Sequence, residues 1–538
     1  AQGFALKLDG LNAFRCVPRV APLHSAVPPT RCSPQMFSHR RPVAWQAVEV
    51  AAGVSIAAFV VRWLLNRSPP RLPGPFSWPF FGCVLELAKY EGELYLAIEA
   101  WRKKYGDAFR FKLFWLECTV LFQPSHIHQV MVSENWPKGY LHRNMIPIMG
   151  EGLVLSDGEL WQRHRRLMSP AFSPTRLQQV VLPHFARYAQ KLREHLEGQA
   201  DGVHIDILGL LTKVTLDIIC SAAFGFHLNS MDGENMEVLH AFERILSVSS
   251  NFARLLPGGA QVMRFLRRHD IAAIDRIIDS AIDSRIRQRT SGVQTAQAEH
   301  AVARKEWDML DLLLDAEDGG IHMGRQAIRD EIYIFFLAGH ETTALNLTWT
   351  LYELARHPEC NARLVQELDA SRADASPASS PSRRQRPVPN LPYTECVLKE
   401  TLRRYPALVA TTRNVPTTRP LQVDGCRLAA GSAVFVPIYS KHHEEDVFHE
   451  PYVFLPERWE TTKVPPTSYM PFTLGPRVCI GQHFFFLEAK ALLLEVLSAV
   501  SLELPDGLPA AAKVEGTSRT GTFRPRGQIM LVLRHRAR

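Results

Sequence analysis

The most constraining feature of this sequence is one very long helical pattern between residues 325 and 356. Apolar residues recur there at spacings of three and four, and Pro358 follows as a stop signal. At about 1.5 Å per residue such a helix is roughly 48 Å long, enough to cross a whole domain. A buried helix of this length needs a large body of other elements around it, so we expect one large domain.

Further helical patterns predominate after residue 84, and short strand-like runs lie between them. The helical patterns lie at 92–105, 159–168, 176–197, 205–225, 235–250, 269–289, 359–370, 392–404 and 484–500. The strand-like runs are Ala108–Leu113, Thr119–Leu121, Leu421–Val423, Ala433–Pro437 and Gln528–Leu533. Residues 371–390 are polar and of low complexity, which predicts an exposed loop. Residues 67–538 are therefore predicted to form a single large domain that is mainly α with small β-sheets.

The first 66 residues differ from the rest. Residues 1–43 are rich in proline and carry six basic residues against one acid. This is typical of an organelle-targeting leader, and a disordered extension fits the same composition. The uncharged run within residues 44–66 is short for a bilayer span, but it reaches about 20 residues if Glu49 and Arg62 extend to the interface. We expect a membrane anchor helix at 44–66, with a buried or interfacial helix as the alternative.

Charge and cysteine usage exclude some kinds of site. The net charge of +8 is spread along the chain and no nucleic-acid motif is present, so we expect no nucleic-acid partner. A basic face would instead suit an acidic protein partner or an anionic membrane. The nine cysteines are widely spaced and form no C-x-x-C pair, which argues against a zinc site.

Only Cys479 has neighbours that indicate more than a packed thiol. It lies in the segment P-F-T-L-G-P-R-V-C-I-G-Q-H-F at 471–484. Gly475 and Gly481 permit a tight turn around the sulfur, so that backbone N–H groups point at it. A helical pattern begins just after the cysteine, and a helix N-terminus lowers the pKa of a nearby thiol. This loop is therefore suited to hold a thiolate, the form of cysteine that binds metals.

The segment L-A-G-H-E-T-T lies at 337–343, inside the long helical pattern. Ala338 and Gly339 are small and leave room beside the helix for a flat ligand. Glu341 and Thr342 place an acid beside a hydroxyl, a pair that can relay protons. A solvated glutamate and an ordinary helix-face threonine are the simpler interpretation of the same residues.

Two other helical patterns carry charged residues at helical spacing. In L-K-E-T-L-R-R-Y-P, Glu400 and Arg403 are three apart and share a helix face, and Arg458 in F-L-P-E-R-W can join them. A surface ion pair is the alternative for these residues. In W-Q-R-H-R, Trp161 and Arg165 are four apart on another predicted helix.

Together, these motifs resemble those of the cytochromes P450. The spacing F-x-x-G-x-R-x-C-x-G resembles the haem-binding signature of that family, and all five fixed residues are present: Phe472, Gly475, Arg477, Cys479 and Gly481. Patterns similar to the family's other motifs follow its order over residues 68–538. One residue, Phe485, departs from the family's pattern, while Ala338 fits that pattern and differs only from one subgroup. Phe485 replaces a residue that is usually small, and Ala338 replaces the glutamate that binds haem covalently in one group of fatty-acid hydroxylases. We therefore expect haem to be held noncovalently.

The resemblance implies the cytochrome P450 fold and a role for each motif. Haem b would be held by Cys479 as the axial thiolate, with Phe472 packed against the sulfur. Partners of the haem propionates would include Trp161, Arg165, Arg413 and Arg477. Proton delivery to iron-bound oxygen would fall to Glu341 and Thr342. A structural brace behind the cysteine loop would be formed by Glu400, Arg403 and Arg458.

The reaction that the resemblance implies is a monooxygenation. One atom of O2 would enter an apolar organic substrate such as a lipid, sterol or terpenoid, and the other would become water. Electrons from NADPH would come through a separate reductase, either a flavoprotein or a ferredoxin-type donor, because no flavin or nicotinamide fingerprint follows the domain. The alternatives are a P450-fold isomerase or peroxide-rearranging enzyme, and a haem-binding sensor or carrier. The predicted anchor favours the endoplasmic reticulum membrane, whereas the basic leader favours a plastid or mitochondrion.

Overall fold

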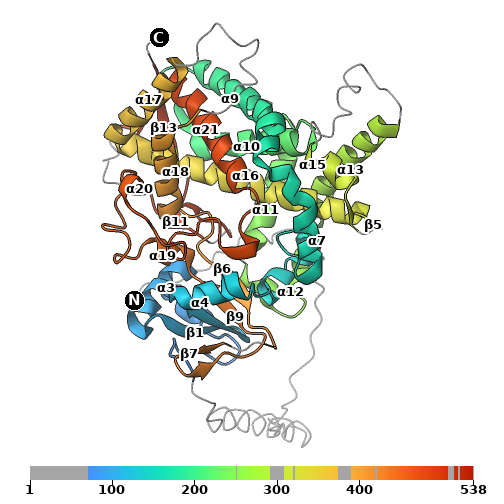
Figure 1. Cartoon of the computed structure of the whole chain (residues 1–538), viewed down its shortest axis with the longest axis vertical. Coiled ribbons are helices and arrows are strands. Elements are labelled where there is room, and N and C mark those ends of the chain that lie inside the picture. The colour runs from blue at the N-terminus through green and yellow to red at the C-terminus, as the bar shows by residue number, and fades with distance from the viewer. Residues whose placement is uncertain are drawn as a thin grey trace, which may run out of the picture. The chain divides into compact units, whose positions relative to one another are not determined.

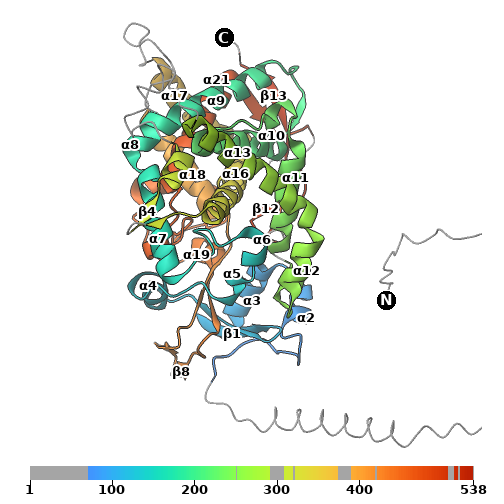
Figure 2. The same ribbon diagram turned by 90° about the vertical axis from the view of Figure 1, so that its right-hand side faces the viewer.

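A computed structural model describes residues 71–536, except residues 250, 291–307, 319–320, 374–388, 419–420, 507–513 and 519–520. The expected leader at 1–43 and the expected anchor at 44–66 therefore lie outside the described residues. So does most of the predicted loop at 371–390, of which the first three residues are helical. Residues 69–538 form one unit in which helices predominate (Figures 1 and 2).

The long helices follow the predicted periodicity closely. They are α3 Leu94–Tyr105, α7 Gly158–Met168, α9 Leu182–Glu197, α10 Ile207–Phe224, α11 Met236–Ser249, α13 Arg268–Thr290, α16 Arg325–Arg356, α17 Pro358–Ala373, α18 Pro392–Arg404 and α21 Gln482–Ala499. One prediction differs, because the helix expected at 176–197 is broken by a π-helical stretch, Leu177–Val181, before α9. Pro183 lies in the first turn of α9, and a proline ring has no N–H to continue an α-helix that began earlier.

Helix α16 runs through the middle of the unit, next to α10 and α18 (Figure 1). Its side chains are buried on almost every face, which is the pattern of a central helix rather than of a surface one. The hydroxyl of Thr215 in α10 donates a 2.9 Å hydrogen bond to the carbonyl oxygen of His340 in α16. This bond crosses between the two helices and fixes their register.

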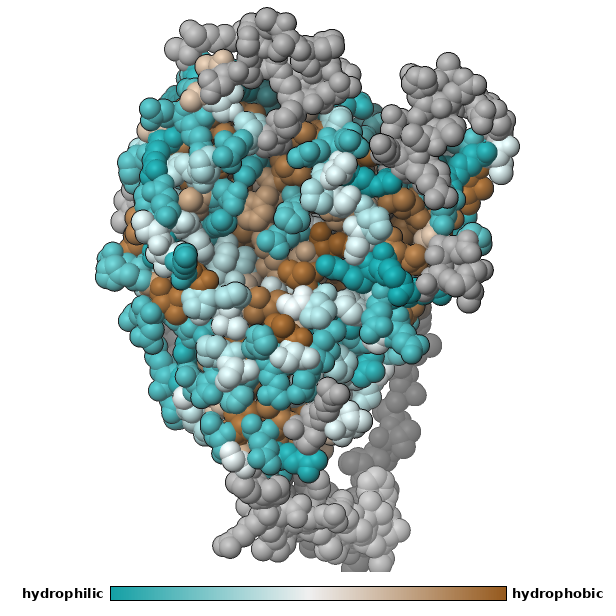
Figure 3. Space-filling model, viewed as in Figure 1, coloured by the Kyte–Doolittle hydropathy of each residue, from teal (hydrophilic) through white to brown (hydrophobic). Residues whose placement is uncertain are grey.

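Helix α10 is the one helix in the described part of the chain that is long and apolar enough to span a membrane. It is mostly buried, between α9 and α16, so its composition reflects a place in the protein core. Hydrophilic side chains cover most of the face seen in Figure 3, and hydrophobic ones show between them in separate areas. The prediction of a mainly helical fold with a large apolar core is confirmed.

The largest sheet joins strands that are far apart in the sequence. Its order is β1 Ala108–Leu113, β2 Leu116–Leu121, β9 Ala433–Val436 and β6 Thr411–Asn414. Strand β2 pairs in parallel with β9, while β6 runs antiparallel to β9. Figure 1 shows the blue strand β1 and the orange strand β9 in the same part of the fold. This pairing places β6, with Arg413, beside segments from the first third of the chain.

The remaining strands form four smaller sheets in the described part of the chain. A three-stranded sheet has the order β10 Val500–Glu503, β13 Met530–His535 and β3 His204–Asp206. Three hairpins are β4 Glu317–Asp318 with β5 Ile321–His322, β7 Gln422–Val423 with β8 Cys426–Arg427, and β11 Gly516–Thr517 with β12 Arg524–Pro525. The predicted strands near 421 and 528 correspond to β7 and β13. The expectation of small β-sheets in a mainly α domain is therefore confirmed.

Candidate functional site

The cysteine loop is held between a short 3-10 turn, Gly475–Arg477, and the start of α21. The backbone N–H of Cys479 donates to the carbonyl oxygen of Phe472 at 2.9 Å, which closes the loop. Gly475 has a φ of +73°, and a Cβ atom there would lie 2.1 Å from the carbonyl oxygen of Met131. Only glycine fits this close approach, so the residue fixes the loop against the segment around Met131.

Cys479 is exposed although protein atoms surround its thiol. It differs in this from the six other cysteines in the described ranges, all of which are buried. Burial by neighbouring atoms nevertheless raises the pKa of this thiol, while the Gly481 backbone N–H, Arg165 and Lys138 lower it. The residue is therefore accessible to a bound group. A metal cation bound there would deprotonate the thiol outright.

Helix α7 contacts the cysteine loop directly through two predicted residues. Arg165 donates from Nη1 to the carbonyl oxygen of Val478 at 2.9 Å. The guanidinium carbon of Arg477 lies 4.3 Å from the centroid of the Trp161 ring, a cation–π contact. Arg477 also donates from Nη1 to the carbonyl oxygen of Ser156 at 3.0 Å. The structure thus brings Trp161, Arg165 and Arg477 together beside Cys479.

Positive charge is concentrated near this loop. Desolvation, followed by repulsion from Arg413 and Arg477, lowers the pKa of Lys138 to about 7. Desolvation and Arg477 likewise lower the pKa of Arg413 to about 10. Asp157 partly offsets the repulsion, since it pairs with Arg477 and accepts from the Lys138 backbone N–H at 3.0 Å. The cluster therefore carries more cations than carboxylates.

The residues present fit haem. The Nε atoms of Arg413 and Arg477 are buried and have no hydrogen-bond partner among the described residues. Two carboxylates, such as the propionates of haem, would satisfy these donors and offset the excess positive charge. In the described ranges no group of three or more His, Cys, Asp and Glu side chains is placed to hold a metal ion. A metal that brings its own ring of ligands, and takes one thiolate from the protein, suits such a site.

A short stretch of α16 is the one part of its core segment that is not buried. Between Glu331 and Leu354 the residues that are exposed or half-buried are Leu337, Ala338, Gly339 and Thr342. The Thr342 hydroxyl donates to the carbonyl oxygen of Ala338 at 2.7 Å, so these two residues share a helix face. An exposed face in the middle of a buried helix is accessible to a ligand. This matches the expectation of room beside Ala338.

Gly339 has a different role from the one expected for it. A Cβ atom at Gly339 would lie 3.1 Å from the side chain of Ile219 in α10. The missing side chain therefore permits close packing of α10 on α16. The sequence motif did not reveal this role, because the contact joins residues that are 120 positions apart.

Glu341 is not hydrogen-bonded to Thr342 in the described part of the chain. Its Oε1 accepts a 2.8 Å hydrogen bond from the Thr522 hydroxyl and an ion-pair contact from Arg524 Nη2. Its side chain is almost fully buried. The structure thus separates the acid from the hydroxyl that the sequence places beside it.

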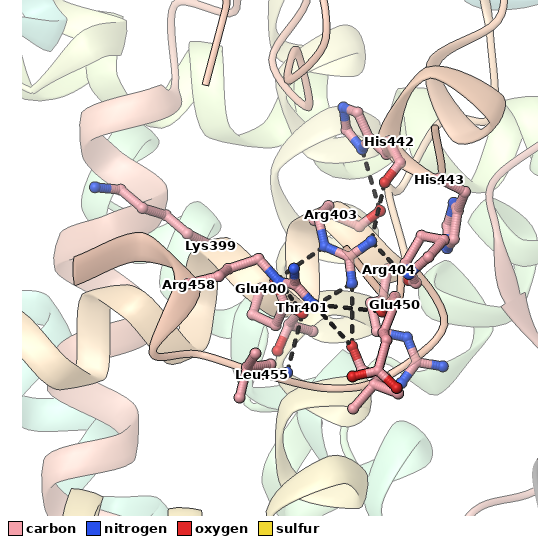
Figure 4. A network of polar contacts seen from close by, with 12 residues as sticks. Lys399, Glu400, Thr401, Arg403, Arg404, His442, His443, Glu450, Leu455 and Arg458 are labelled. Atoms are coloured by element: carbon pink, nitrogen blue, oxygen red, sulfur yellow. Dashed lines mark hydrogen bonds and ion pairs between the residues drawn. The ribbon is translucent and has the colours of Figure 1, made fainter. Parts of the chain in front are cut away.

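The expected brace forms around the carboxylate of Glu400 (Figure 4). Arg403 donates to both oxygens, at 2.9 and 2.8 Å, and Arg458 donates to Oε1 at 3.1 Å. Arg403 also donates to the carbonyl oxygen of His442 at 2.9 Å, and the His442 ring accepts from the backbone N–H of Met470 at 2.9 Å. Met470 immediately precedes the segment that carries Cys479. The network therefore reaches the cysteine loop.

Sequence reasoning missed three residues of this region: Lys138, Asp157 and Arg524. Asp157 had a usable signal, because it lies at the N-cap position of α7 just before Trp161. Lys138 and Arg524 had none, since each is a single charged residue outside any motif. Their placement depends on contacts between distant segments.

Comparison with known proteins agrees with this geometry. The family model for cytochrome P450 matches residues 72–527. A putative cytochrome P450, CYP13A3, of Caenorhabditis elegans is 29% identical over 84% of this chain and 91% of its own length. Cytochrome P450 4c3 of Drosophila melanogaster is 27% identical over 84% and 88%. Cytochrome P450 monooxygenase 128 of Postia placenta is 30% identical over 84% and 91%. The chain therefore belongs to the cytochrome P450 family of haem-thiolate monooxygenases.

Proposed function

We propose that this protein transfers one oxygen atom of O2 to an apolar small molecule, with electrons supplied by a separate reductase. The observation that carries the proposal is Cys479, an exposed residue beside a cluster of cations in which Arg413 and Arg477 are buried. We take the space at Cys479 and the open face of α16 at Ala338 and Thr342 to be one haem pocket. The electron donor would be an NADPH-dependent flavoprotein or a ferredoxin-type protein.

Each residue near this pocket has a proposed role. Haem b, when bound, supplies the redox chemistry that activates O2. Cys479 is its thiolate ligand, and Arg413, Arg477 and Lys138 hold its carboxylates. The Thr342 hydroxyl would donate a proton into the pocket, and Glu341 would resupply that proton.

An apolar substrate is supported by the chemistry of the open face of α16. Leu337, Ala338 and Gly339 offer no polar side-chain atom, and Thr342 offers a single hydroxyl. A polar or charged substrate would lose its hydration there without gaining hydrogen bonds in return. A lipid, sterol or terpenoid would lose little hydration free energy on entering the pocket.

We also propose that the protein is bound to a membrane, with residues 44–66 as the anchor and the endoplasmic reticulum as its location. The apolar composition of that segment supports this. So do four aromatic residues that follow it and are exposed: Phe76, Trp78, Phe80 and Phe81. Extraction of the full chain from membranes by detergent but not by alkaline carbonate is the expected result. Release by carbonate would overturn the proposal of a spanning anchor.

Turnover with different oxygen sources tests the reaction. We expect substrate oxidation with O2, NADPH and a reductase. Turnover with a hydroperoxide alone, and none with O2 and reductase, would contradict the proposal and favour a peroxide-rearranging enzyme. A screen of lipids for changes in the haem absorption spectrum would find the substrate class.

Thr342→Ala tests the proposed proton donor. We expect a smaller fraction of NADPH electrons in product, with haem content unchanged. Thr348→Ala is the matched control, because Thr348 makes the same 2.7 Å bond to the carbonyl four residues earlier but is buried. Equal coupling of electrons to product in Thr342→Ala and wild type would remove Thr342 from the mechanism.

A further inference from the structure

The carboxylate of Glu331 joins two segments of the candidate site to the central helix α16. Glu331 is fully buried, and His164 of α7 is almost fully buried. The Oε1 atom of Glu331 contacts Nδ1 of His164 at 2.6 Å, and Oε2 accepts a 3.0 Å hydrogen bond from the backbone N–H of Leu153. Two segments that are remote from α16 in the sequence are thus held by one side chain.

The backbone beside this hydrogen bond packs tightly against one turn of α16. The backbone N–H of Glu151 donates to Oδ2 of Asp330 at 2.9 Å. A Cβ atom at Gly150 would lie 2.3 Å from the side chain of Asp330, and one at Gly152 would lie 2.7 Å from its carbonyl oxygen. The two glycines therefore let this backbone approach the helix closely, and the neighbouring carboxylate binds it there.

The other end of the same segment contacts the cations beside the cysteine loop. The carbonyl oxygen of Val154 accepts from Lys138 Nζ. The carbonyl oxygen of Ser156 accepts from Arg477 Nη1 at 3.0 Å. Asp157 pairs with Arg477 and accepts from the Lys138 backbone N–H at 3.0 Å. These three residues directly follow the hydrogen bond to α16 in the sequence, so one short stretch of backbone connects the helix with the cations.

Helix α7 is joined to α16 through the second contact of the same carboxylate. His164 directly precedes Arg165, which donates to the carbonyl oxygen of Val478 at 2.9 Å. One turn earlier on α7, the ring of Trp161 lies against the guanidinium of Arg477. A shift of α7 relative to α16 would therefore move both of these contacts to the cysteine loop.

We propose that Glu331 is a positioning residue for haem binding, which acts through His164 and the backbone at Leu153 to hold Arg477 and Lys138 where they reach the carboxylates of haem. Donors that are fixed before the ligand arrives lose little conformational entropy on binding. The buried Nε atom of Arg477, which has no partner among the described residues, is such a donor. This inference rests on the proposed function, in which these cations bind haem.

The experiment measures the rate of haem transfer from the haem-loaded full chain to a haem-free acceptor protein. It uses haem and haem dimethyl ester, which has the same iron and ring but no carboxylate for the cations to bind. Glu331→Leu should speed the loss of haem roughly tenfold, as expected for one lost hydrogen bond to a charged group. It should leave the loss of the dimethyl ester at the wild-type rate, because the cations do not hold that compound.

Two further variants separate positioning from a general effect on folding. Glu331→Gln should lose haem as slowly as wild type, because its amide keeps an acceptor for the Leu153 N–H and a donor for His164. His164→Leu removes one of the two contacts and should speed the loss of haem but not of its dimethyl ester. It carries the same test if Glu331→Leu does not fold.

Asp217→Leu is the matched control. Asp217 is also fully buried and accepts from the backbone N–H groups of Ser230 and Met231, at 2.8 and 3.1 Å, but that loop carries none of the cations. The control should lower the stability of the fold and leave haem loss unchanged. Equal acceleration for haem and its dimethyl ester in Glu331→Leu or His164→Leu would overturn the inference. So would unchanged haem loss in both, or a fast loss in Glu331→Gln.

Failure of this inference differs from failure of the proposed function. If the wild-type protein binds haem and turns over with O2 and reductase, the function stands whatever the Glu331 variants do. If the wild-type protein takes up no haem, the proposed function itself fails.

Discussion

At the scale of single residues, two groups of buried charges have opposite properties. The carboxylate of Glu400 accepts from Arg403, Arg458 and the Trp459 indole, so its charge is fully paired. Lys138, Arg413 and Arg477 instead repel one another, and the Nε atoms of the two arginines are buried without a partner among the described residues. A satisfied network braces a fold, whereas an unsatisfied one is a binding site for an anion. We therefore assign the first group to structure and the second to the cofactor.

Replacement of Arg403 tests the structural assignment. Arg403→Met removes the bidentate partner of the buried Glu400 and leaves it Arg458 as its ion-pair partner, and breaking a buried pair costs about 3–5 kcal/mol in the free energy of unfolding. Urea denaturation measures this loss. Lys399→Met is the control on the same helix, because its ion pair with Glu395 is partly exposed and worth at most about 1 kcal/mol. Equal losses in the two variants would contradict the assignment.

Replacement of Lys138 tests the cofactor assignment, because it should stabilise the haem-free protein but weaken the binding of haem. Desolvation, Arg413 and Arg477 lower the pKa of Lys138 from 10.5 to about 7 in the folded chain. Between about pH 7 and pH 10 the unfolded chain then binds more protons, so the free energy of unfolding of haem-free protein rises with pH. Lys138→Met should remove that rise and stabilise the haem-free protein at neutral pH. In haem-bound protein the same substitution should speed haem loss, which is measured as the rate of haem transfer to a haem-free acceptor protein.

Two outcomes would contradict this role for Lys138. One is slower or unchanged haem loss in Lys138→Met. The other is an unchanged rise of stability with pH in the haem-free variant. Lys112→Met is a suitable control, because Lys112 is half-buried, as Lys138 is, but lies on β1, at the opposite edge of the sheet from β6, which carries Arg413.

At the scale of elements, the packing of α10 on α16 shows why motif reading succeeds only in part. Periodicity is local, so the bounds of α16 and α18 could be predicted from the sequence to the residue. The loop that carries Cys479 could be predicted because its glycines and charges are close together in the chain. Gly339 was assigned to an open face, yet it contacts Ile219. Such a contact between distant residues has no local signature.

A double-mutant cycle on Gly339 and Ile219 tests this packing. Gly339→Ala should destabilise the protein by about 0.5–2 kcal/mol, because the strain of a methyl group pressed against Ile219 exceeds the gain in helix propensity. Ile219→Ala also destabilises the protein, since it leaves a cavity, but it makes room for that methyl group. The combined loss should therefore be smaller than the sum of the two, as measured by thermal unfolding. Strictly additive losses would show that the two residues do not touch.

At the scale of the whole molecule, the fold brings motifs from five parts of the chain to one region. Helix α7, strand β6, the cysteine loop and Lys138 meet there, and the Glu400 network reaches the same loop from behind. The sequence order of the motifs predicted the family, and with it the closeness of helix α7, strand β6 and the cysteine loop. It could not predict that Glu341 would contact Arg524, 183 residues away, because that choice of partner depends on the packed hairpin.

The central claim is that Cys479 is the thiolate ligand of haem iron, and the reduced carbon monoxide complex tests it most directly. We predict a red-shifted Soret band, which reports a thiolate opposite the carbon monoxide, and its loss in Cys479→Ala. Cys426→Ala is the control, because Cys426 is buried in a hairpin and should leave the band in place. A red-shifted band that survives in Cys479→Ala, or its absence from the haem-loaded wild type, would contradict the assignment of this cysteine.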